Sequence, residues 1–148
     1  MTAPSSKLRA SITTMFTVPI LIGSLFAMIA AAIHVVIFVL ESFRWNLPQT
    51  WRMFGIRSQE DASRTEFLAY NQGFYNLFLA IGAALGALFH FENTVAAFTL
   101  TLFSCSSMVL AAVVLVTASR SSLRPALIQG VPPLVAVIST VVAILALP

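Results

Sequence analysis

The chain has 148 residues, of which 59% are hydrophobic and only 9% are charged. A soluble domain is usually about 25% charged, so this composition excludes a water-soluble globule and indicates an integral membrane protein. The 8 basic and 5 acidic residues form no basic stripe, which argues against nucleic acid as a partner. The single Cys105 cannot form an intramolecular disulfide. We expect one integral membrane domain over residues 1–148.

Four apolar windows are each long enough to cross a bilayer, whose hydrocarbon core takes about 20 helical residues. They cover residues 16–40, 67–89, 95–116 and 125–147. The first window follows Lys7 and Arg9 as the core of a signal peptide would, but its apolar run is too long for one, so we expect a retained span. The sequence therefore predicts an all-α fold, a four-helix transmembrane bundle with a short interfacial helix in the first loop.

The first loop contains the signals of that short helix. In "WNLPQTWRMFG", Pro48 suits the first position of a helix and Gly55 suits its end. Trp51 and Arg52 are neighbours, and tryptophan beside arginine is typical of the headgroup layer. We expect the helix to lie on the membrane surface, with Trp51 and Phe54 at headgroup level.

The second span has start signals of its own. Ser58 and Asp61 resemble a capping box in which aspartate replaces the usual glutamate. Glu60 and Arg64 are four residues apart, a spacing at which opposite charges pair along a helix.

The basic residues near the span ends predict the direction of the spans. Six lie in the first and third loops and two precede the first span: Arg44, Arg52, Arg57, Arg64, Arg120 and Arg124, against Lys7 and Arg9. We expect both termini outside a bacterial inner (plasma) membrane and the first and third loops in the cytoplasm.

Seven polar or ionisable side chains lie in one half of the membrane, whichever way the chain is inserted. The first span ends and the second begins at the first loop, and the fourth begins on the same side, so residues near these span ends share a depth. The seven are His34, Glu41, Asn71, Gln72, Tyr75, Asn76 and Gln129.

The residue spacing of the first span predicts that its polar side chains face inward. At 100° per residue, His34 and Glu41 align with Gly23, Ala27 and Ala30, and small residues mark a buried helix face.

The residue patterns of the second and fourth spans also predict that their polar side chains face inward. Asn71 and Tyr75 share an arc with Gly82 and Gly86, a pair that lets helices approach closely. Pro132 and Pro133 lie just past Gln129 and free backbone carbonyls in the preceding turn. The sequence therefore predicts a polar intramembrane cavity on the loop-one side.

The strings "IHVVIFVLESFRW", "WRMFG", "LAYNQGFYNLFLAIG" and "LIQGVPP" resemble a family of small four-span bacterial membrane proteins catalogued as a domain of unknown function. The shared motifs are a His and a Glu seven residues apart, N-Q-G-x-Y-N and Q-G-x-P, between His34 and Pro133. The resemblance implies the fold and a membrane location. Some members are labelled epimerases automatically, which implies no site residue here. The extension before Thr14 is longer than is usual in the family.

His34 and Glu41 are the candidate catalytic residues, as a proton relay or half of a metal site, because ionisable groups within spans are often functional. The alternative is a satisfied interior histidine beside a boundary glutamate. A catalytic zinc needs three protein ligands, and no second His or Cys lies at this depth, so we expect no metal and no cofactor.

The amide cluster also has two interpretations. Asn71, Gln72, Tyr75 and Asn76 could bind a polar headgroup or a small ligand, or could form hydrogen bonds between helices. Four polar groups in six positions exceed what helix association usually needs, which favours a binding site.

Three functions follow from these alternatives. The first is binding or moving a small amphipathic or lipid-like molecule. The second is a membrane-embedded acid–base enzyme, isomerase-like, acting on a lipophilic substrate. The third is a structural membrane subunit. Membrane lipid is an expected partner, and a homo-oligomer could supply the inverted repeat that a transporter of this size needs.

Overall fold

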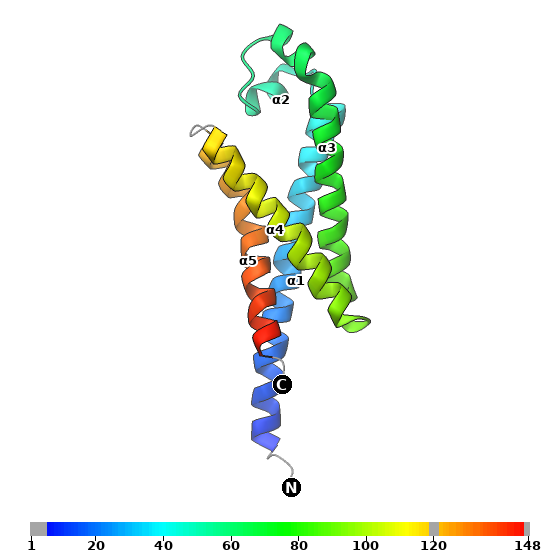
Figure 1. Cartoon of the computed structure of the whole chain (residues 1–148), viewed down its shortest axis with the longest axis vertical. Helices are drawn as coiled ribbons and strands as arrows, with labels where there is room; N and C mark the ends of the chain where they lie inside the picture. The colour runs from blue at the N-terminus through cyan, green and yellow to red at the C-terminus, as the bar shows by residue number, and fades with distance from the viewer. Residues whose placement is uncertain (1–5, 119–121, 147–148) are drawn as a thin grey trace.

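The computed structural model describes residues 6–118 and 122–146, and this part of the chain is all-α. Its long helices alternate in direction, so the helix ends at Ala118 and Leu123 lie at the same end of the bundle as the first loop (Figure 1). The elements are α1 (Ser6–Phe43), α2 (Pro48–Met53), α3 (Gln59–Leu88), the 3-10 helix η1 (Phe89–Phe91), α4 (Thr94–Ala118) and α5 (Leu123–Leu145). We call the end that carries α2 the loop-one end.

Three segments of the described helices are long and apolar enough to cross a membrane, which indicates a multi-pass membrane protein. They are Phe16–Phe43 of α1, Thr94–Ala118 and Leu123–Leu145. The second predicted span, 67–89, covers the later part of α3 and the first residue of η1, and it stays a prediction. The predicted end of the fourth span at Leu147 and the basic residue Arg120 lie outside the described residues.

The start of α3 confirms its predicted signals. The Asp61 backbone N–H donates to Ser58 Oγ at 3.1 Å, and that hydroxyl donates to Asp61 Oδ2 at 2.7 Å. Arg64 pairs with Glu60 at 2.6 Å. The capped start adds a polar first part, residues 59–66, so α3 begins well before the apolar window.

The short helix of the first loop forms as predicted, with Pro48 in its first turn and Gly55 after its end at φ +80°. Its tryptophan does not face the surroundings, however. The exposed fraction of Trp51 is 3%, and its Nε1 donates to Gln59 Oε1 at 3.3 Å. The Trp51 ring is therefore held inside the protein, because the early start of α3 gives it a protein partner. The headgroup level of Trp51 and Phe54 stays a prediction.

The other tryptophan of the loop is buried in the same way. Trp45 Nε1 donates to Ala62 O at 2.9 Å, and its ring packs with Trp51 against Ala62 and Ala69 of α3. The loop is thus a folded unit attached to α3.

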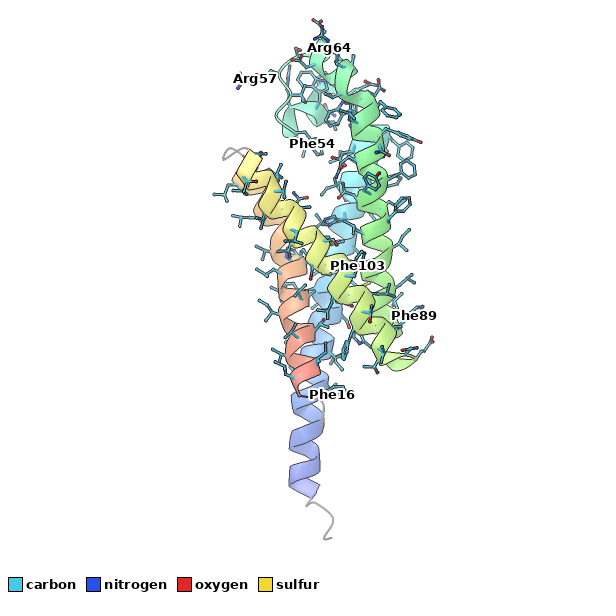
Figure 2. The ribbon with its side chains drawn as sticks, in the orientation of Figure 1. Phe16, Phe54, Arg57, Arg64, Phe89 and Phe103 are labelled. Carbon is cyan, nitrogen blue, oxygen red and sulfur yellow. The ribbon has the colours of Figure 1, made fainter. Side chains whose placement is uncertain are left out.

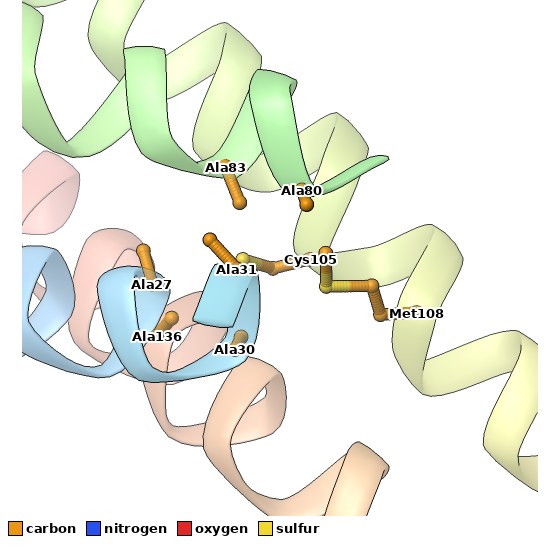
Figure 3. Packing of buried hydrophobic residues seen from close by; sticks show 8 residues of the cluster. All are labelled: Ala27, Ala30, Ala31, Ala80, Ala83, Cys105, Met108 and Ala136. Atoms are coloured by element: carbon orange, nitrogen blue, oxygen red, sulfur yellow. The ribbon is translucent and has the colours of Figure 1, made fainter. Parts of the chain in front are cut away.

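The centre of the bundle is built from small side chains (Figure 3). Alanines of α1, α3 and α5 meet one cysteine and one methionine of α4: Ala27, Ala30, Ala31, Ala80, Ala83, Ala136, Cys105 and Met108. Helices surrounded by lipid associate chiefly through close van der Waals packing, which small residues permit.

The predicted close approach at Gly82 and Gly86 is confirmed, and the partner helix is α4. A β-carbon added at Gly82 would touch Ser104 Oγ. One added at Gly86 would lie 2.7 Å from the backbone nitrogen of Thr101 and 3.1 Å from the carbonyl oxygen of Ala97.

We predict that Gly86→Ala lowers the thermal stability of the protein in detergent more than Gly82→Ala does. At Gly82 the obstacle is a hydroxyl that can rotate away, and alanine gains up to about 1 kcal/mol of helix propensity there. At Gly86 the obstacle is backbone, so the added methyl group forces the helices apart, at a typical overpacking cost of about 1–3 kcal/mol. The measurement is the melting midpoint by circular dichroism, and equal midpoints would contradict this packing.

Candidate functional site

The predicted inward stripe of α1 is confirmed along its length. Gly23, Ala27 and Ala30 are buried, and the stripe continues through His34, 1% exposed, to Glu41, 8% exposed. Two ionisable side chains therefore lie inside the bundle on one face of α1, two helical turns apart.

Glu41 is held by the neighbouring helix. Asn76 Nδ2 donates to Glu41 Oε2 at 2.9 Å and to the carbonyl of Gln72 at 3.1 Å. Asn76 is itself 9% exposed, so both partners are buried. This bond joins the end of α1 to the motif "NQGFYN" of α3.

A glycine allows this bond to form. A β-carbon at Gly73 would touch Ser42 Oγ and lie 3.1 Å from the carbonyl oxygen of Phe38. The Ser42 hydroxyl donates to the carbonyl of Tyr70 at 3.1 Å, which fixes the same register. Ser42 and Gly73 were not among the predicted site residues, although Gly73 lies within the amide motif and Ser42 follows Glu41.

His34 bonds to its own helix. Its Nδ1 lies 2.9 Å from the carbonyl oxygen of Ala30. Because a carbonyl can only accept, Nδ1 carries the hydrogen, and in the neutral ring Nε2 is the acceptor. His34 and Glu41 thus bond to different partners, and the described hydrogen bonds do not join them as a relay.

Gln129 is half-buried and lies on the α1-facing side of α5. It is eleven residues before Thr140, which places both on one helical stripe. A β-carbon at Gly23 would lie 3.3 Å from Thr140 Oγ1, so this stripe faces α1. The antiparallel register then brings Gln129 to about the depth of His34. Pro133 has no N–H to bond the carbonyl of Gln129.

The other three predicted site residues point outward, so the expectation that they face the interior is wrong. Asn71 and Gln72 are exposed, and the exposed fraction of Tyr75 is 53%. The predicted arc itself is correct, because Asn71 and Tyr75 do lie in line with Gly82 and Gly86. We call the exposed part of this arc, residues 71, 72 and 75, the open arc of α3.

The cause is the course of α4, which contacts α3 in the far half of the bundle and diverges from it toward the loop-one end (Figure 1). Where the two helices diverge, the residues on the face of α4 that meets α3 are no longer buried. Its buried residues Thr101, Ser104 and Met108 are followed at helical spacing by residues that are exposed or half-buried, namely Ala111, Leu115 and Ala118. We call these three the open stripe of α4.

At the far end of α3, His90 lies outside the predicted site. Its ring meets the ring of Phe98 edge-on, with centroids 5.5 Å apart, and burial lowers the pKa of its imidazole. Within residues 6–118 and 122–146, no three histidine, cysteine, aspartate or glutamate side chains gather as a metal ion would require.

The family model for the protein of unknown function DUF1304 matches residues 28–141, and the chain belongs to this family. The resemblance inferred from the sequence motifs is thereby confirmed. No curated protein and no solved structure matches the chain significantly.

We predict that Asn76→Leu destabilises the protein and Asn71→Leu does not. The first change leaves the buried Glu41 carboxyl without its partner, at a typical cost of about 1–3 kcal/mol. The second removes an exposed amide, so it is a matched control in the same helix. The measurement is the free energy of unfolding in mixed micelles titrated with dodecyl sulfate. A loss of stability for Asn71→Leu equal to that for Asn76→Leu would show that the exposed amide also supports the fold.

Proposed function

We propose that this member of the DUF1304 family is a membrane-embedded binding module for a small single-chain amphipathic molecule. The molecule lies between the open arc of α3 and the open stripe of α4, with its polar group on Asn71, Gln72 and Tyr75. Its hydrocarbon part lies against Ala111, Leu115 and Ala118.

The observation that carries this proposal is that α4 leaves the open arc of α3 uncovered. The arc of α3 that packs on α4 through Gly82 and Gly86 carries polar side chains where α4 has diverged. Asn71 and Gln72 supply both donors and acceptors, and Tyr75 adds a hydroxyl. Amides and hydroxyls at the edge of the hydrocarbon are costly when they lack hydrogen-bond partners, so a polar occupant stabilises this arrangement.

The level of the open arc supports an amphipathic occupant. The Ser42–Tyr70 hydrogen bond places Asn71 beside the end of α1, and the apolar segment of α1 ends at Phe43. Polar and aromatic residues at such a level belong near the boundary between hydrocarbon and headgroups. A molecule bound there has its head at the boundary and its chain in the hydrocarbon, opposite the apolar surface of α4.

The test uses a lysophospholipid that carries a photoreactive diazirine in its chain, added to the protein in nanodiscs. We predict cross-links in residues 110–118 of α4 that excess unlabelled lysophospholipid suppresses. Labelling of the outward face of α1 around Val36, which is 57% exposed, should be insensitive to that competitor.

The paired variants are Asn71→Leu and Tyr75→Phe, which remove polar groups from the open arc with little effect on the fold. Both should reduce the competitor-sensitive labelling several-fold, while Val36→Leu should not. Labelling of α4 that no competitor suppresses would overturn the proposal. Cross-linked dimers through α3 would show instead that a second copy covers the arc.

Orientation is a separate proposal, based on the basic residues of the first and third loops. Gln49 of α2 and Glu92, which lies between η1 and α4, both have exposed side chains, so each can be replaced by cysteine. Native Cys105 is fully buried and will not react. With the termini outside, a membrane-impermeant thiol reagent labels Glu92→Cys in intact cells and labels Gln49→Cys only after lysis. The reverse pattern would invert the topology.

A further inference from the structure

The loop-one end carries arginines that no carboxylate neutralises. Arg44, Arg52 and Arg57 are exposed, and none of them forms an ion pair within the described residues. The carboxylates of this end have other partners: Glu60 pairs with Arg64, Asp61 accepts from Ser58, Glu66 accepts from Asn46 and Glu41 accepts from Asn76. The positive charge of the three arginines is therefore available to a partner outside the chain.

These arginines are mounted on a folded unit. Trp45 and Trp51 are buried against α3 and hold the loop in place. The Arg52 guanidinium lies 5.0 Å from the centroid of the Trp51 ring, which stabilises the cation and fixes its position. Positions fixed in this way cost less conformational entropy on binding than arginines in a slack loop would.

Apolar side chains accompany the arginines on the same surface. Phe43, Leu47, Met53 and Phe54 are all exposed, Met53 to 67% and Phe43 to 66%. Figure 2 shows Phe54 at the edge of the loop nearest to α4, whereas Arg57 projects from its outer side and Arg64 lies at the tip of α3. This order, with Phe54 toward the bundle and Arg57 and Arg64 beyond it, matches the order of acyl chains and phosphates in a leaflet.

We infer that this surface, formed by Arg44, Arg52 and Arg57 with Met53 and Phe54, binds the headgroups of anionic phospholipids in the leaflet that faces loop one. Every basic residue after Lys7 is arginine, and the planar guanidinium fork binds phosphate through two parallel hydrogen bonds. The site is separate from the open arc of α3, and it stands or falls independently of the proposed function.

The chain supplies its own reporter for this inference. Both of its tryptophans, Trp45 and Trp51, belong to the loop-one cluster, so selectively excited tryptophan fluorescence reports on this surface alone. The protein is reconstituted in nanodiscs that mix phosphatidylglycerol and phosphatidylcholine, with one of the two lipids brominated. Brominated phosphatidylglycerol should quench more strongly than brominated phosphatidylcholine at the same mole fraction.

Substitutions of the arginines measure how much each one contributes to the preference for phosphatidylglycerol. A basic residue near an anionic surface contributes about 1 kcal/mol, which corresponds to about a five-fold preference for each arginine at low salt. Arg44→Gln, Arg52→Gln and Arg57→Gln should each reduce the preference by up to that factor. The matched control, Arg64→Gln, removes an arginine already paired with Glu60 and should leave the preference unchanged.

Two further measurements keep the result interpretable. Raising the salt concentration on the wild-type protein should weaken the preference without any substitution, so a variant that fails to fold does not decide the outcome. Millimolar inorganic phosphate should not abolish it, because the surface requires headgroups anchored in a leaflet. Equal quenching by the two lipids in the wild type, or complete displacement by inorganic phosphate, would overturn the inference.

Discussion

The packing of the helices depends on the glycines of α3, which have no side chain. Helices in lipid gain little from burying apolar surface, since the acyl chains are as apolar as leucine, so contact forms where backbones can approach. Gly73 provides that approach to α1, and Gly82 and Gly86 provide it to α4. The two contacts lie on different sides of α3 and at different depths. α3 therefore approaches α1 closely near the loop-one end and approaches α4 closely near the opposite end.

This arrangement explains why the polar residues of one short motif have different environments. Asn76 lies on the α1 side of α3, where Gly73 brings the helices together, and it bonds the buried Glu41. Asn71 and Tyr75 lie on the α4 side, at a depth that α4 no longer covers. Asn76 accordingly has the features of a structural group, while the exposed pair is the basis of the proposed binding surface. Asn71 and Asn76 carry the same uncharged amide, and only their positions on the helix separate them.

The sequence predicts the faces of the helices well and their neighbours poorly. The spacing of Gly23, Ala27, Ala30, His34 and Glu41 identifies the buried stripe of α1, and the caps of α3 and the short α2 follow from local signals that involve few residues. Periodicity assigns a residue to an arc because that requires only the helix repeat. It does not say whether a neighbouring helix covers the arc over its whole length, because that depends on the crossing angle of α3 and α4.

The first loop shows the same limit at closer range. Tryptophan beside arginine favours the headgroup layer, and this argument holds for a helix that lies alone on a membrane. Here Ser58 starts α3 early, which places Gln59 and Ala62 beside the loop, and both indole N–H groups find protein acceptors there.

The apolar side chains that remain exposed on the loop are those of Leu47, Met53 and Phe54, of which the sequence already predicts Phe54 at headgroup level. Arg44, Arg52 and Arg57 also remain exposed, and none of them pairs with a carboxylate among the described residues. Burying the tryptophans therefore changes which side chains the loop exposes, while the exposed surface still combines apolar and basic groups. A folded loop can also hold its charges at fixed positions, which a flexible basic segment cannot do.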